Sequence, residues 1–266
     1  MSPTPHRLSH RLHGVLDDAR RPVLVLVHGW CCDSGYWDAQ LDDLAADHRV
    51  VTLDLAGHGA SFDLATDGRI ASFGADVATT VTACLDGLPG AAAVTLIGHS
   101  MGGPVSVEAA LRLGSRVHAV IGVDTLAWVG LPKASSEVTA ALLQPFERDF
   151  VTSTRAFVEQ TFFLPDADPA LRTRIAADMA AGDPAVGLAA LHGINDWNGA
   201  AALGALDVPL VVINAAVTRT DEARLQGLAR RFRLREMTGV GHFLMMEQPA
   251  RFNAVLREEL ATLAAR

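Results

Sequence analysis

The sequence predicts an α/β fold in which a mostly parallel central sheet is flanked by helices and carries one long helical insertion. Short apolar runs rich in β-branched residues recur along the chain, and helix-length segments separate most of them. Between residues 126 and 206 the strand-like runs disappear. With 266 residues, of which 50% are hydrophobic, the chain is long enough for one large domain with a well-buried core.

The expected strands of the central sheet are the apolar runs at residues 22–27, 49–53, 93–97, 117–123 and 209–213, followed by a short strand signal at 232–237. Segment 8–16 alternates less regularly and contains a glycine, which favours an antiparallel edge strand. Helices are expected at 36–46, 73–88, 101–113, 221–231 and 249–264, the last with a proline in its first turn.

Residues 127–205 predict a helical lid inserted into the core domain. Ala, Leu, Arg and Glu occur there at helical spacing, with interruptions at Pro165, Pro169 and Pro184. The segment also carries seven of the fifteen aromatic side chains of the protein, which indicates an apolar surface over the site. We therefore expect a core domain made of residues 1–126 and 206–266 and a lid made of residues 127–205.

Composition narrows the classes of partner. The formal net charge of −8 and the pI near 5.6 argue against a nucleic-acid surface, because binding phosphates requires clustered Lys and Arg. No apolar run approaches the ~20 residues of a membrane-spanning helix, and residues 1–7 lack the apolar stretch of a secretory signal. We expect a cytoplasmic protein with a small-molecule substrate and neither membrane nor nucleic acid as partner. The oligomeric state is left open.

The three cysteines predict neither a disulfide framework nor a metal site. Cys31 and Cys32 are adjacent and Cys84 is distant, so the spacing matches no set of zinc ligands. Free, at least partly buried thiols are expected.

The run Gly98-His99-Ser100-Met101-Gly102-Gly103 lies between a predicted strand and a predicted helix, which is the setting of a nucleophile elbow. In such a strained turn the small residues on either side of the serine avoid clashes between strand and helix. The turn would present the Ser100 hydroxyl above the sheet, at the positive end of the helix. Ser100 is thus the predicted nucleophile.

An oxyanion hole is expected from two backbone N–H groups, those of Met101 and Trp30. Negative charge builds up on the former carbonyl oxygen during acyl transfer, and preorganised donors stabilise it. His28-Gly29-Trp30 follows a predicted strand and suits this loop, with His28 in a structural role. We expect the side chains of Trp30 and Trp128 to line the substrate pocket.

His242 is the predicted general base. It lies in Gly239-Val240-Gly241-His242-Phe243, a loop between the last predicted strand and the C-terminal helix. Loops at the carboxyl ends of parallel strands are where sites of this kind assemble. Of the ten histidines, it has the most suitable setting.

Nearly the whole chain resembles the α/β-hydrolase superfamily. The resemblance rests on four motifs in the expected order: His28-Gly29-Trp30, the turn Asp54-Leu55-Ala56-Gly57-His58-Gly59-Ala60-Ser61, the Ser100 elbow and Gly241-His242. It implies an α/β-hydrolase fold and a triad of serine, histidine and an acid.

The chain departs from the resemblance at the acid. Most members carry the acid in a run similar to Ile-x-Gly-x-x-Asp after the lid, whereas the equivalent run here ends in Thr218. Asp124 follows a strand on the same rim as Ser100, and some members take their acid from that strand. Asp221 is the alternative acid, although an aspartate there is also a common helix N-cap. We expect Asp124 to be the acid.

These residues predict hydrolysis of carboxylic esters of small-to-medium, largely apolar substrates, with no metal or organic cofactor. The same groups would serve C–C, lactone, amide or thioester bonds. Two other classes stay open. Gly29-Trp30-Cys31 and the early acid resemble cofactor-independent dioxygenases of this fold, in which a His–Asp dyad deprotonates a heteroaromatic substrate. A receptor-like protein would keep the triad and bind ligand with negligible turnover.

Overall fold

The computed structural model describes residues 4–14, 21–88, 90 and 93–265 of the chain. Its centre is a sheet with the strand order β1-β3-β2-β4-β5-β6-β7. The strands are β1 (His10–Gly14), β2 (Val23–Val27), β3 (Arg49–Leu53), β4 (Val94–His99), β5 (Val117–Val123), β6 (Leu210–Ala215) and β7 (Phe232–Met237). All neighbouring pairs are parallel except β1 with β3. The prediction of a mostly parallel sheet is confirmed.

Burial explains why the inner strands are continuous apolar runs. Every residue of β2, β3, β4 and β6 is buried, as expected for strands covered by helices on both faces. β1 has half-buried and exposed residues only, and it pairs antiparallel at the edge. The predicted edge strand is confirmed for His10–Gly14, whereas residues 15 and 16 lie outside the described residues.

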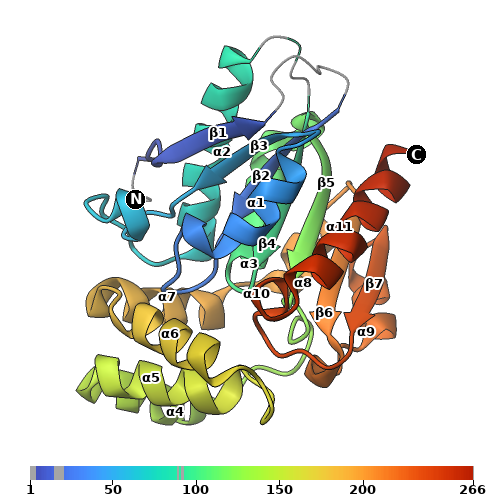
Figure 1. Ribbon diagram of the computed structural model, residues 1–266. Coiled ribbons are helices and arrows are strands. Elements are labelled where there is room, and N and C mark those ends of the chain that lie inside the picture. The colour runs from blue at the N-terminus through green and yellow to red at the C-terminus, as the bar shows by residue number, and fades with distance from the viewer. Residues whose placement is uncertain (1–3, 15–20, 89, 91–92, 266) are drawn as a thin grey trace.

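Helices form layers on the two faces of the sheet (Figure 1). α1 (Asp38–Leu44) and α11 (Pro249–Ala264) lie on one face, and α2 (Ile70–Gly87) and α3 (Gly102–Leu113) pack together on the other. The shorter helices are α8 (Gly199–Gly204), α9 (Glu222–Leu228) and α10 (Leu244–Glu247). Within the described ranges, no helix combines the length and the apolar character needed to cross a bilayer.

The helix expected at 73–88 begins three residues earlier, at Ile70, and two other predicted helices were wrong at their ends. The helix expected at 36–46 is preceded by a 3-10 turn at Ser34–Trp37 and ends at Leu44. The one expected at 221–231 ends at Leu228, because Ala229 already has extended backbone and leads into β7. Both differences lie at helix ends, where the hydrophobic pattern carries little information.

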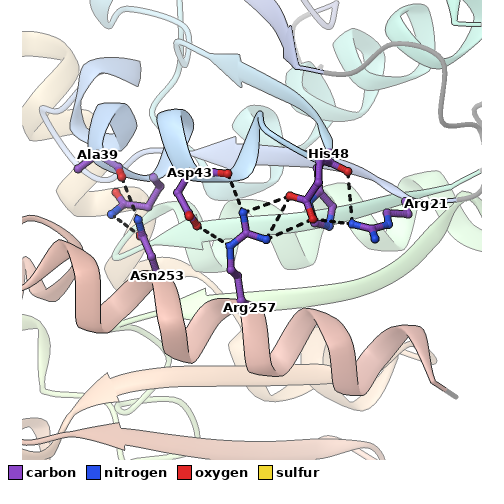
Figure 2. Close-up of polar contacts among 8 residues, drawn as sticks. Arg21, Ala39, Asp43, His48, Asn253 and Arg257 are labelled. Carbon is purple, nitrogen blue, oxygen red and sulfur yellow. Dashed lines mark hydrogen bonds and ion pairs between the residues drawn. The ribbon is translucent and has the colours of Figure 1, made fainter.

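A polar network ties α11, near the C-terminus, to α1 and to the residues that follow α1 (Figure 2). Arg257 donates through Nε to Asp43 Oδ2 at 2.7 Å and through both terminal nitrogens to Asp47. Asn253 donates to the Ala39 carbonyl at 3.0 Å. Burial opposes the charge on Asp47, but hydrogen bonds from Arg21, His48 and Arg257 outweigh it and lower the pKa of the carboxyl to about 2. The network fixes α11, and with it the loop that precedes this helix.

Between β5 and α8 lie the helices α4 (Ser136–Arg148), α5 (Phe150–Thr161), α6 (Pro169–Ala180) and α7 (Pro184–Asp196). They gather below the sheet in Figure 1, at the end where β4 and β5 finish. Aspartates at 149, 168 and 183 cap the starts of α5, α6 and α7, and Pro169 and Pro184 occupy first turns. The insertion is helical, as predicted, while the division into a core and a lid with boundaries at 126 and 206 stays a prediction.

Candidate active site

Ser100 lies in a tight turn between β4 and α3. Its φ of +52° is left-handed, a strained conformation for a residue with a side chain. A Cβ at Gly98 would come within 2.1 Å of the Gly102 carbonyl oxygen, and one at Gly102 within 2.4 Å of the Val27 oxygen. Thr125 Oγ1 donates to the Ser100 carbonyl at 2.7 Å. The turn has the shape that the glycines predicted, and it leaves Ser100 only partly buried.

Asp124 directly follows β5 and reaches the same end of the sheet. Its φ is +42°, and its N–H donates to Ile213 O on β6 at 2.9 Å. One carboxylate oxygen, Oδ1, accepts from Ala215 N and from Thr218 Oγ1, both at 2.9 Å. The other, Oδ2, accepts from His242 Nδ1 at 2.6 Å. The residue at the usual acid position, Thr218, therefore holds the carboxylate of Asp124.

The charge on Asp124 is stabilised despite burial. Burial alone would raise the pKa of the carboxyl, but hydrogen bonds from His242, Ala215 and Thr218, with the charge of His242, outweigh it and hold the pKa below its usual range. A carboxylate that stays ionised and accepts from Nδ1–H fixes the tautomer of His242 that leaves Nε2 as the proton acceptor.

Asp221 lies apart from this group. Its side chain accepts from the backbone N–H of Arg224 at 3.0 Å and caps the start of α9. An N-cap is the other role that the sequence analysis considered for Asp221. The side chain of Asp221 makes no hydrogen bond to His242, which pairs with Asp124.

Three residues that the sequence did not single out hold the His242 loop. His99 Nε2 donates to the His242 carbonyl at 3.0 Å. Glu247 accepts from the N–H groups of Gly241, at 2.9 and 3.1 Å, and Phe243, at 3.2 Å. Phe162, in the α5–α6 connection, stacks on the imidazole with 4.2 Å between ring centroids, and its carbonyl accepts from His242 N at 2.7 Å.

Only weak sequence signals pointed to these residues. Phe162 belonged to the aromatic group of the insertion, but nothing in its spacing distinguished it from Phe163. His99 occupies the variable position of the elbow. Burial lowers the pKa of His99 to about 3, with a further contribution from His242, so this ring is neutral and acts as a hydrogen-bond donor.

The loop at 28–30 lies against Ser100. A Cβ at Gly29 would be 3.1 Å from the Ser100 Cβ, a tight contact that glycine avoids where the two turns approach each other. His28 Nε2 accepts from Leu55 N at 3.0 Å and Nδ1 contacts the Gly29 carbonyl at 2.9 Å, which is the structural role expected for His28. Within the described residues, neither Trp30 N–H nor Met101 N–H donates a hydrogen bond. Both amides are thus available to a ligand.

Ser100, Asp124 and His242 line one cavity of about 190 Å³, here called the Ser100 cavity. Trp128 lines it too, with 40% of its surface exposed. Trp30 is buried: its Nε1 donates to the Gly187 carbonyl at 2.8 Å, and its ring contacts Phe146, Phe150 and Phe157 edge-on. Trp30 therefore joins the core to the insertion, and its predicted role in the pocket stays a prediction.

The three cysteines are free, and Cys31 and Cys32 are buried, as expected. Burial raises the pKa of both thiols above the usual range, so neither is a thiolate nucleophile at neutral pH. No group of three or more His, Cys, Asp or Glu side chains in the described part of the chain is arranged to hold a metal ion.

The chain matches a family model and is similar in sequence to known proteins. A model of the alpha/beta hydrolase family matches residues 24–255. A pimeloyl-[acyl-carrier protein] methyl ester esterase from Nitrosomonas europaea is 40% identical over 100 residues, which cover 38% of this chain and 36% of that protein. A biotin biosynthesis bifunctional protein from Cellvibrio japonicus is 28% identical over 259 residues, covering 92% of this chain and 48% of that protein.

Solved structures share the fold. A thermophilic esterase from Thermogutta terrifontis superimposes with a TM-score of 0.79 at 23% identity, over 97% of this chain and 94% of that one. At this level of identity the likeness establishes the architecture alone.

Proposed function

Since the chain belongs to the alpha/beta hydrolase family, we propose that it hydrolyses carboxylic esters of small-to-medium, largely apolar substrates through an acyl-enzyme formed on Ser100. The observation that carries this proposal is the 2.6 Å contact between His242 Nδ1 and Asp124 Oδ2 beside a cavity that Ser100 also lines. The name of the Nitrosomonas europaea relative, a methyl ester esterase, supports the ester as the bond cleaved.

In the acylation step, His242 Nε2 takes the proton of the Ser100 hydroxyl as its oxygen attacks the ester carbonyl. The negative charge on the former carbonyl oxygen is stabilised by the N–H groups of Met101 and Trp30. The tetrahedral intermediate collapses, the ester C–O bond breaks, and His242 gives its proton to the leaving alcohol. Asp124 stabilises the transient imidazolium and is not itself protonated.

In the deacylation step, His242 removes a proton from water, and the hydroxide formed attacks the acyl-enzyme. Collapse of the second tetrahedral intermediate returns the proton to Ser100 and releases the carboxylic acid. We propose that residues 127–205 act as the lid over this reaction and limit the access of bulk water. No metal or organic cofactor takes part in these steps.

The experiment is the steady release of nitrophenol from 4-nitrophenyl butyrate by the purified protein, with Ser100→Ala as the control. We expect multiple turnovers in the original protein and none above background in the variant. Oxygen consumption with a hydroxyquinolone that survives Ser100→Ala would instead identify the dioxygenase chemistry. Tight ligand binding without turnover would identify a receptor.

A further inference from the structure

A second, larger hollow lies next to the Ser100 cavity. It has a volume of about 550 Å³ and is formed by residues 128–134, by α4, and by the segment from the end of α7 to the start of α8. We call it the apolar groove. The Ser100 cavity, at about 190 Å³, is smaller than the roughly 300–1,000 Å³ of most ligand pockets, whereas the groove falls within that range.

The two hollows share part of their walls. Trp128 and Ile194 line both the Ser100 cavity and the apolar groove. The two hollows meet at these side chains, so a ligand would have to extend past Trp128 and Ile194 to reach from the reacting serine into the groove. The groove is therefore placed to hold a part of the substrate that takes no part in bond cleavage.

The lining of the groove is nearly free of charge. Its one ionisable side chain is Lys133, whose Nζ donates to the Asp196 carbonyl at 3.2 Å. Leu131 and Leu142 line the groove with 51% and 64% of their surface exposed. Covering large apolar side chains that are open to water is favourable, so the lining suits an apolar ligand, with Lys133 as its single charged group among the described residues.

The inner wall of the groove is fixed in place. Trp197 Nε1 donates to Glu108 Oε1 at 2.9 Å, which ties this ring to α3. Trp128 meets the Trp197 ring edge-on at 5.8 Å between centroids. A Cβ at Gly199 would lie 2.8 Å from the Trp197 ring and 2.9 Å from Val129, so glycine allows this close packing. A preformed wall reduces the entropy lost on binding.

We propose that the apolar groove binds an unbranched apolar chain of the ester, about six carbons or longer, while the ester group reacts at Ser100. This inference rests on the proposed function and specifies its substrate class. The apolar chain bound in the groove belongs either to the acyl group or to the alcohol of the ester, and the experiment separates these two cases.

The test measures kcat/KM for two series of soluble esters below their micelle-forming concentrations. One series lengthens the acyl group from 4-nitrophenyl butyrate to the octanoate, and the other lengthens the alcohol from butyl to octyl acetate. We expect kcat/KM to rise in one series by about twofold for each added methylene, less than the roughly fourfold of complete burial because the groove is open on one side.

Leu142→Lys and Val138→Lys form a matched pair on α4. Both side chains are largely exposed, at 64% and 51%, but only Leu142 lines the groove. In the series that responds to chain length, we expect Leu142→Lys to lower the ratio of kcat/KM between the eight-carbon and four-carbon substrates at least fivefold, and Val138→Lys to leave that ratio unchanged. Thermal unfolding of both variants checks that the fold is retained.

Failure of the proposed function and failure of the groove proposal give different results. If butyrate hydrolysis is absent or survives Ser100→Ala, the proposed function itself is wrong. If butyrate hydrolysis depends on Ser100 but kcat/KM is flat in both series, only the groove proposal is overturned. An equal effect of the two lysine variants on the eight-carbon to four-carbon ratio in the responding series would also overturn it.

Discussion

At Asp124, the two oxygens of one carboxylate have separate tasks. Oδ2 contacts His242 Nδ1, while Oδ1 accepts from Ala215 N and Thr218 Oγ1. The second pair of contacts prevents rotation of the carboxylate, so the first keeps its direction. The orientation of the His242 ring thus depends on the last residue of β6, Ala215, and on Thr218 after it, as well as on Asp124.

Replacing Asp124 by Asn is predicted to lower kcat by about three to four orders of magnitude. An amide can present its N–H₂ to Nδ1, which favours the wrong tautomer of His242, and it carries no charge to stabilise the imidazolium. The measurement is kcat for 4-nitrophenyl butyrate. Asp221→Asn is the matched control, because asparagine is an equally good N-cap and kcat should hardly change. A larger loss in Asp221→Asn would refute the assignment of the acid.

Thr218→Val is predicted to lower the free energy of unfolding by about 1.5 kcal/mol, because a charged acceptor loses one donor. We also expect a lower kcat, since Oδ1 of Asp124 is then held by Ala215 N alone and the carboxylate can rotate away from His242. Thr218→Ser retains the hydroxyl and should behave like the original protein in both urea unfolding and kcat. Equal stability of the valine and serine variants would show that the contact at 2.9 Å contributes nothing.

The sequence predicted the placement of Asp124 and its pairing with His242, but not the residues that hold its other oxygen. A carboxylate at the end of a parallel strand must face the rim where the serine lies, so position alone indicated the acid. Thr218 was noticed only because it stands where an acid was expected. Its hydrogen bond depends on the geometry of the turn after β6, which no local pattern encodes.

Among the elements, the loop that carries His242 is held from two sides. Glu247, at the end of α10, accepts from backbone N–H groups on both sides of the histidine. Phe162, between α5 and α6, covers the imidazole face and bonds its backbone. The insertion thus contacts the proposed base directly, and its position should affect kcat.

Phe162→Ala is predicted to lower kcat by about ten- to a hundredfold, because a small displacement of the imidazole has a large effect on proton transfer. Phe163→Ala is the matched control: Phe163 is also partly buried, but its ring stacks on Phe243. Both variants should lose similar stability in thermal unfolding, while only Phe162→Ala loses kcat. Equal kcat values in the two variants would argue against the positioning role of Phe162.

The order of strands and helices was predictable from hydrophobic periodicity, because each strand is either buried on both faces or placed at the edge. The contacts between the insertion and the core were not. Trp30 with Phe146, Phe150 and Phe157, and Phe162 with His242, are pairs far apart in the sequence. Aromatic content indicated that the insertion packs on something apolar but could not say on which residue.

Across the whole molecule, buried neutral histidines link stability to pH. Burial lowers the pKa of His99 to about 3, and burial with the neighbouring His28 lowers that of His58 to about 4. In the unfolded chain both rings titrate near 6.5. Between pH 6.5 and 4 the unfolded state therefore binds more protons, and the free energy of unfolding falls as the pH falls.

We predict a loss of about 1.4 kcal/mol per pH unit for each of these two histidines over that window, measured by urea unfolding at a series of pH values. Glu247 and Asp76 have raised pKa values, chiefly through burial, and oppose the trend at its acidic end. His58→Gln should reduce the slope of the free energy of unfolding against pH by the contribution of one histidine. Replacing the exposed His192 by Gln should not. Identical slopes in all three proteins would contradict this linkage.

The most direct test of the proposed mechanism is the mass of the protein quenched in acid during turnover of 4-nitrophenyl butyrate, followed by peptide mapping. We expect a single butyryl group on Ser100 that is absent from Ser100→Ala. Turnover that leaves the butyryl group on another residue, or that continues in Ser100→Ala, would contradict it.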